Sequence, residues 1–218
     1  MPVPVHEFEI TVARTARYLV RGEETTSTGR CWYALHGYAQ LAHEVSEAAS
    51  PLIAAGGRLV APEALSRFYR DPHDAERTPA AVGASWMTRE ARGGEIRDYI
   101  AYLDAVHTAV GSPAHAAVLG FSQGAATAAR WATLGAVRPR LLVLWGGIEP
   151  DDLDEAARAR LVAMRVVYVH GDFDRLLDHA VPRRRADALR TAGGDADVVT
   201  FPGGHRLDPG VLSRLAEF

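Results

Sequence analysis

The stretch Ala116-Ala117-Val118-Leu119-Gly120-Phe121-Ser122-Gln123-Gly124 decides the fold and indicates a chemistry. An apolar run typical of a buried strand leads into Gly-x-Ser-x-Gly, and an alanine-rich segment typical of a closely packed helix follows. A serine on such a strand-to-helix turn is lifted above the sheet, and glycines on both sides let backbones approach where a Cβ would clash. The pattern predicts that Ser122 is a nucleophile; the alternative is an ordinary turn with an incidental serine.

Strand-like and helical patterns alternate on both sides of this turn. The strand-like runs are residues 31–35, 58–61, 116–121, 141–145, 165–170 and 197–201. Apolar residues recur at helical spacing over residues 96–110, and Asp208-Pro209 opens a final helix. We therefore expect an α/β fold: a mostly parallel, twisted sheet with helices on both faces. In such sheets the ligand binds beyond the carboxyl ends of the strands.

Two segments fall outside this alternation. Phe8, Ile10 and Val12 alternate with polar residues, and Tyr18-Leu19-Val20 follows, which predicts a hairpin near the start. Residues 62–92 show no clear strand, and a connection of this length is often functional. A partial cap over Ser122 and ordinary anchoring of the loop are both open for it. No repeat or linker is visible, so residues 1–218 are expected to form one domain without a large separate cap.

Composition restricts the possible partners and chemistries. The 218 residues include 24 basic and 27 acidic side chains, a net charge of −3 that argues against nucleic acid as the main partner. Every basic residue is arginine, which excludes a lysine Schiff base, a Ser–Lys dyad and a P-loop lysine. The single cysteine, Cys31, indicates a reducing compartment. With no secretion signal or membrane-length apolar run, we expect a cytoplasmic protein without membrane insertion.

A serine nucleophile requires a histidine base, and three histidines follow Ser122 in the chain. His205 lies after the last predicted strand, where this type of sheet places the base. His170 ends the preceding strand, which favours a packing role, and His179 falls on the helix that follows, which favours a surface position. We therefore predict that His205 is the base.

The histidine in turn requires a carboxylate that orients it. Asp172, Asp174 and Asp178 follow the strand at residues 165–170. Asp174 is the favoured acid because it lies further into the loop, whereas Asp172 fits the usual role of aspartate in bonding turn amides. Asp172 stays open as the alternative.

The strand at residues 31–35 ends in His36-Gly37, where an acyl-transfer enzyme needs a donor for the oxyanion. We predict that the backbone N–H groups of Tyr38 and Gln123 form the oxyanion hole; the alternative for His36-Gly37 is an ordinary turn. No metal-ligand spacing is present, and no metal is expected. The candidates for substrate contact are Trp86, Met87, Trp145 and Leu176.

Four motifs together resemble the α/β-hydrolase fold, and within it the phospholipase/carboxylesterase family, which includes acyl-protein thioesterases and bacterial carboxylesterases. They are Leu35-His36-Gly37, Gly120-Phe121-Ser122-Gln123-Gly124, His170-Gly171-Asp172-Phe173-Asp174 and Gly204-His205. The resemblance implies a three-layer α/β sandwich, a hydrolase without metal or organic cofactor, and Asp174 as the triad acid. Tyr38-Ala39-Gln40 and Arg175-Leu176-Leu177-Asp178 depart from the family pattern, so no substrate is transferred from any one member.

These expectations combine into a serine hydrolase that cleaves small-molecule carboxylic esters through an acyl-enzyme. An acyl thioesterase and a lysophospholipase stay open as alternatives. A non-catalytic small-molecule-binding protein on the same fold is the alternative from another class. The sequence does not distinguish a monomer from a homodimer.

Overall fold

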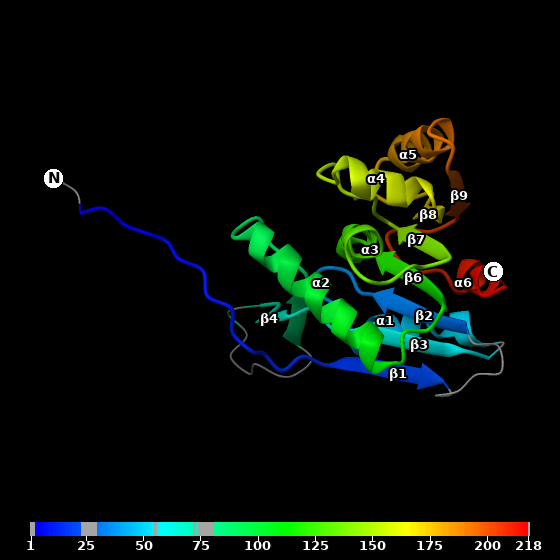
Figure 1. Ribbon diagram of the computed structural model, residues 1–218. Coiled ribbons are helices and arrows are strands. Elements are labelled where there is room, and N and C mark those ends of the chain that lie inside the picture. The colour runs from blue at the N-terminus through cyan, green and yellow to red at the C-terminus, as the bar shows by residue number, and fades with distance from the viewer. Residues whose placement is uncertain (1–2, 23–29, 55, 72, 74–80, 218) are drawn as a thin grey trace.

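The computed structural model describes residues 3–22, 30–54, 56–71, 73 and 81–217 (Figure 1). Its main sheet has seven strands in the order β1-β3-β2-β6-β7-β8-β9, and every pairing is parallel except that of β1 with β3. The strands are β1 Tyr18–Gly22, β2 Arg30–Leu35, β3 Arg58–Pro62, β6 His115–Phe121, β7 Leu141–Trp145, β8 Arg165–Gly171 and β9 Asp195–Phe201. The predicted α/β fold is confirmed.

Helices cover both faces of this sheet and make three layers (Figure 1). They are α1 Ala42–Ala48, the 3-10 helix η1 Ser50–Ile53, α2 Arg92–Ala109, α3 Gln123–Leu134, α4 Glu155–Val162, α5 Ala180–Thr191 and α6 Pro209–Leu215. One core cluster joins the sheet to α2, α3, α4 and α5, and a second joins it to α1, η1 and α6. Successive residues of a strand point to opposite faces of the sheet, so they belong alternately to the two clusters. Trp32, for example, lies in one cluster and Tyr33 in the other.

Local sequence explains the two helices that flank the functional edge. Small residues let α3 pack closely on the sheet, with Ala125, Ala128 and Ala132 fully buried. The α6 helix starts where the sequence predicts, because the Asp208 carboxylate accepts hydrogen bonds from the N–H groups of Gly210 and Val211, both 3.1 Å long. Within the described residues, no helix is both long and apolar enough to cross a membrane.

The predicted N-terminal hairpin is wrong. The described residues 3–17 contain no strand or helix, and Phe8 and Ile10 are 88% and 87% exposed. The strand predicted around Tyr18 does form, but β1 pairs with β3 instead of with the preceding segment.

The expectation that residues 62–92 lack strands is also wrong. Strands β4 (Ser66–Tyr69) and β5 (Val82–Ser85) pair antiparallel, and each is too short for its pattern to stand out in the sequence. Residues 72 and 74–80 of this segment lie outside the described residues. The β5 backbone is fastened to the loop after β2, because Ala39 N–H donates to Ala84 O at 2.9 Å and Ala84 N–H donates to Gln40 O at 3.1 Å.

Candidate active site

Ser122 lies on the sharp turn between β6 and α3 and adopts a strained backbone, with φ 54° and ψ −117°. The flanking glycines make this turn possible. A Cβ on Gly120 would lie 2.1 Å from Gly124 O, and a Cβ on Gly124 would lie 2.4 Å from Leu35 O. A hydrogen bond of 2.8 Å from Ser122 N–H to Trp145 O holds the turn against β7. This is the geometry that presents a serine hydroxyl above a sheet.

His205 and Asp174 form a hydrogen-bonded pair at the same edge of the sheet. His205 Nδ1 lies 2.7 Å from Asp174 Oδ2, and the Asp174 side chain is 1% exposed. Leu176 N–H donates to the other carboxylate oxygen at 2.8 Å. The carboxylate assigns the proton to Nδ1, which leaves Nε2 as an acceptor. Nε2 is buried and has no hydrogen-bond partner among the described residues, so its lone pair is available.

The loop that follows β7 brings this pair close to the serine turn. A Cβ on Gly146 (φ 59°) would lie 2.9 Å from His205 Cε1, and a Cβ on Gly147 would lie 2.7 Å from Ser122 O. The Phe121 ring also contacts His205, with centroids 4.9 Å apart. The structure therefore gathers the predicted nucleophile, base and acid at the carboxyl ends of β6, β8 and β9.

The alternative residues take other places. Asp172 is exposed, and its backbone N–H donates to Phe201 O at 2.9 Å, which joins the loop after β8 to the end of β9. His170 is 1% exposed and packs against His179, with ring centroids 5.0 Å apart. The residue that hydrogen-bonds His205 is Asp174, which favours Asp174 over Asp172 as the acid.

The loop after β2 lies directly beside the nucleophile. A Cβ on Gly37 would be 3.2 Å from Ser122 Cβ. The Gly37 N–H is engaged by the Gln40 side-chain oxygen at 2.8 Å. The next amide, that of Tyr38, has no acceptor among the described residues, and the Gln123 amide is the first of α3, where helices leave N–H groups unpaired. These are the two amides predicted for the oxyanion hole.

Sequence reasoning did not assign a role to His36, which holds this loop in place. Its ring is fully buried; Nδ1 lies 2.7 Å from Gly37 O, and Nε2 accepts from Ala64 N–H at 3.0 Å. Burial lowers the pKa of His36, so a neutral imidazole with its proton on Nδ1 satisfies both contacts. The sequence signal that could have indicated this role is the spacing His36-Gly37-x-x-Gln40. It places the side chains of His36 and Gln40, which both hydrogen-bond Gly37, on either side of that residue.

The Gln123 side chain fastens the end of β5 to the serine turn. Its Nε2 donates to Met87 O at 2.8 Å and to Ser85 Oγ at 3.1 Å, and its Oε1 accepts from Trp86 N–H at 3.1 Å. The Trp86 indole is 2% exposed and donates to His36 O at 2.8 Å. The segment for which a partial cap and ordinary anchoring were both open is thus anchored to the serine turn where it leaves β5.

The two tryptophans proposed for substrate contact support loops instead. Like Trp86, Trp145 is buried (1% exposed), and its indole N–H donates to Arg206 O at 2.9 Å, next to His205. Leu176 is 75% exposed beside the Asp174 loop, and Met87 is half-buried. Of the four candidates, only Leu176 and Met87 retain exposed side-chain surface for a substrate.

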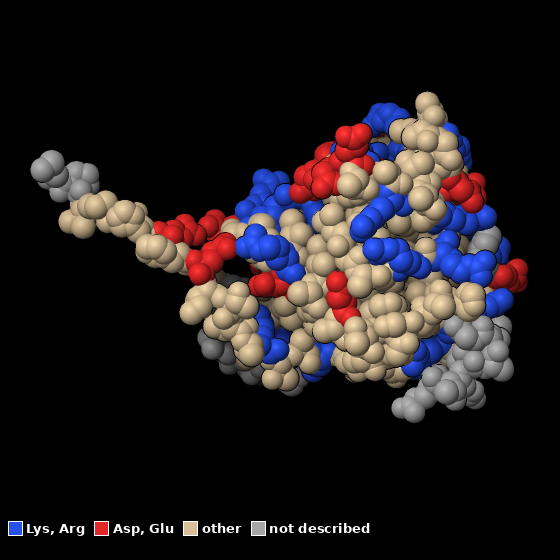
Figure 2. Space-filling view, in the orientation of Figure 1, with Lys and Arg blue, Asp and Glu red and all other residues tan. Residues whose placement is uncertain are grey.

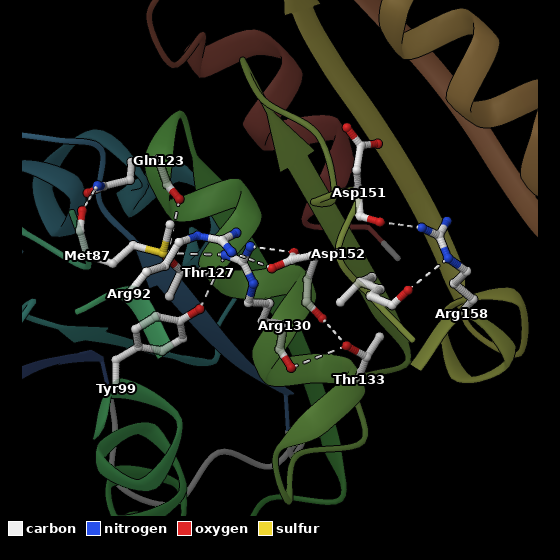
Figure 3. Close-up of polar contacts among 12 residues, drawn as sticks. Met87, Arg92, Tyr99, Gln123, Thr127, Arg130, Thr133, Asp151, Asp152 and Arg158 are labelled. Carbon is white, nitrogen blue, oxygen red and sulfur yellow. Dashed lines mark hydrogen bonds and ion pairs between the residues drawn. The ribbon is translucent and has the colours of Figure 1, made fainter. Parts of the chain in front are cut away.

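A buried arginine links the elements around the site (Figure 3). Arg130 on α3, with a side chain 3% exposed, donates to Asp152 at 2.7 Å; its other terminal nitrogen lies 3.5 Å from Tyr99 Oη and 3.6 Å from Met87 Sδ. Arg92, at the start of α2, bonds the second Asp152 oxygen at 2.7 Å. Burial would raise the pKa of Asp152, but hydrogen bonds from both arginines outweigh it and lower the pKa to about 2. The cluster fixes the loop after β7 to α2 and α3.

No three His, Cys, Asp or Glu side chains are gathered as metal ligands in the part of the chain that the structure describes. The chemistry that these residues can support is nucleophilic acyl transfer, with a serine, a histidine base and paired backbone donors.

Comparisons with known proteins agree with this fold. Carboxylesterase from Mesorhizobium loti is 19% identical with a TM-score of 0.71, covering 93% of this chain and 94% of that one. Acyl-protein thioesterase 2 from Zea mays is 19% identical with a TM-score of 0.70, covering 93% and 97%. Esterase PE8 is 20% identical with a TM-score of 0.69, covering 94% and 98%. These likenesses confirm the α/β-hydrolase fold.

No curated protein sequence matches this chain. A family model described as serine hydrolase (FSH1) matches residues 32–208, which include the loop after β2, the serine turn and His205. Because this match spans most of the chain, the protein belongs to the FSH1 family of serine hydrolases.

Proposed function

We propose that this serine hydrolase cleaves carboxylic esters of small molecules with Ser122, His205 and Asp174. The observation that carries the proposal is the 2.7 Å His205–Asp174 hydrogen bond, which leaves a buried, unpartnered Nε2 next to a strained serine turn. A histidine held in this tautomer has the free lone pair that a general base requires. The mechanism that follows requires no metal or organic cofactor.

In the proposed reaction Ser122 Oγ attacks the acyl carbonyl while His205 Nε2 takes the hydroxyl proton. The tetrahedral oxyanion is held by the N–H groups of Tyr38 and Gln123, and the imidazolium is stabilised by Asp174. His205 returns the proton to the departing alkoxide as the carbonyl–oxygen bond breaks, which leaves an ester on Ser122. Water, deprotonated by His205, then attacks this ester and releases the acid.

An acyl thioester is the second candidate substrate. The likeness to acyl-protein thioesterase 2 from Zea mays favours it, because the same triad cleaves either ester and only the leaving group differs. Leu176 and Met87 are proposed to contact the acyl group from opposite sides of the serine turn, since they belong to the loop after β8 and the segment after β5. A lysophospholipid is the third substrate to be compared.

The test is hydrolysis of p-nitrophenyl esters from C2 to C16, and of matched acyl thioesters and lysophospholipids, by wild type and Ser122→Ala. We expect Ser122→Ala to lower kcat by on the order of 10⁶. The matched control is Ser112→Ala, because Ser112 is exposed and also has a positive φ of 46°. Retention of more than about a tenth of wild-type turnover in Ser122→Ala would refute the assignment. Absence of both turnover and fluorophosphonate labelling at Ser122 would support a non-catalytic binding protein.

A further inference from the structure

The N-terminal segment carries apolar side chains that nothing in the described chain covers. Residues 3–17 have no regular secondary structure, and Figures 1 and 2 show the segment running away from the body of the molecule. We call residues 3–12 the arm. Its large apolar side chains are Val3, Val5, Phe8, Ile10 and Val12, which are 85%, 93%, 88%, 87% and 71% exposed.

The contacts of the arm with its own chain are too weak to hold it. Glu9 and Arg97 form an ion pair of 2.7 Å, but both side chains are 67% exposed. An exposed pair contributes little to stability, whereas ordering each residue of an extended segment costs conformational entropy. The period-2 alternation of residues 8, 10 and 12 is that of a strand with one covered face. The arm therefore has the pattern of a strand that lacks its partner.

The strand that follows the arm offers a matching open edge. β1 is an outer strand of the sheet, pairs only with β3, and leaves Tyr18, Leu19 and Val20 37–44% exposed. The opposite outer strand, β9, carries Asp195 and Asp197, which are ion-paired with arginines. Charges of this kind protect an edge from further pairing, and β1 has no comparable row of them.

The anchored connection directs the arm away from its own β1. Arg17 donates two hydrogen bonds to Glu63, at 2.7 and 2.8 Å, and its carbonyl accepts from Tyr102 Oη at 2.7 Å. A hairpin within the chain would require residues 13–17 to reverse direction immediately before this anchor. Residues 3–17 do not fold back onto β1 (Figure 1), so the partner we consider for the arm is the equivalent edge on another molecule, as in exchanged dimers.

We infer that the arm pairs with the β1 edge of a second copy of this chain, in a two-fold dimer. Each copy supplies one arm and one β1 edge, so in a dimer both arms and both edges are paired. No unpaired arm or edge is then left to bind a third copy. Residues 8–12 match the five-residue length of β1. The acidic Glu7 of the arm would meet the basic Arg14 that precedes the edge, whereas Glu9 and Arg21 are already ion-paired with Arg97 and Glu47.

The test is the mass of the full chain in solution, by sedimentation velocity over about 1 to 100 µM, since assembly depends on concentration. Wild type is compared with the double variant Phe8→Asp/Ile10→Asp. The control is Leu134→Asp, which puts one aspartate on another exposed apolar site, 44% exposed at the end of α3. Because all three positions are exposed, ester hydrolysis and circular dichroism should show that each variant is folded.

We expect wild type and Leu134→Asp at twice the 23.5 kDa of one chain, and the double variant as a monomer with the dimer Kd raised at least about 100-fold. A wild-type protein that stays at the mass of one chain throughout would overturn the inference in favour of an arm that stays unpaired or folds back. A double variant that still dimerises like wild type would also overturn it, because another surface would then form the dimer. Loss of the dimer in the control as well would show that the arm is not the cause.

Discussion

Replacing Gln123 with leucine separates the structural role of its side chain from the proposed role of its backbone. The substitution removes the hydrogen bonds to Met87 O and Ser85 Oγ, and it leaves the buried Trp86 N–H without an acceptor. Each lost bond costs about 0.5–1.5 kcal/mol, and a buried unsatisfied donor costs about 1–3 kcal/mol. Because Met87 O keeps its 2.9 Å hydrogen bond from Ser85, we expect a total loss of about 2–4 kcal/mol.

The assay is thermal unfolding together with ester hydrolysis well below the midpoint. For a chain of this size each kcal/mol shifts Tm by about 2–4 °C, so Gln123→Leu should lower Tm by about 4–16 °C. The backbone N–H is unchanged, so kcat should stay within about tenfold of wild type, less than the roughly 10²–10³-fold loss of an oxyanion donor. The control is Thr133→Val on the same helix, which loses a buried hydroxyl that donates to Ala129 O, with an expected cost of about 1 kcal/mol.

Two results would refute this reasoning. A Tm within about 1 °C of wild type would show that the Gln123 amide does not stabilise the attachment of β5. A loss of kcat comparable to that of Ser122→Ala, in protein that is fully folded at the assay temperature, would place the side chain in the chemistry.

Three further predictions test the site and its supports. Asp174→Asn should lower kcat for ester hydrolysis roughly 10⁴-fold, because the asparagine favours the wrong tautomer of His205. Asp172→Asn, at an exposed position, should keep a kcat near that of wild type. A larger loss of kcat in Asp172→Asn than in Asp174→Asn would make Asp172 the acid. Gly124→Ala places a Cβ 2.4 Å from Leu35 O. We expect the free energy of unfolding, measured in urea, to fall by about 3 kcal/mol or more, or the variant not to fold. A urea midpoint equal to that of wild type would contradict this contact. Two arginines lower the pKa of Asp152 to about 2, so its stabilisation is complete above pH about 4 and is lost as the pH falls toward 2. The stability difference between wild type and Asp152→Asn should therefore shrink between about pH 4 and pH 2, and a constant difference would exclude that titration.

The sequence by itself determined the α/β architecture and the order of the chemical groups along it. The glycines around Ser122 and the apolar runs are local features of the sequence. A turn too tight for a Cβ requires glycine, and a strand with a buried face requires apolar residues, so both can be recognised within a few residues. The same holds for Asp208, whose capping role at α6 follows from its position before Pro209.

Only the tertiary structure decided which groups meet. Asp172 and Asp174 differ by two residues, and the preference for Asp174 acquires a geometric basis only when β9 brings His205 within 2.7 Å. Likewise, the support roles of Trp145 and Trp86 depend on acceptors that are distant in the sequence. The apolar alternation of residues 8–12 predicted a strand, but the partner of a strand is set by which edges are open in space. Local periodicity can identify a surface that must be covered, whereas what covers it is a property of the assembled fold.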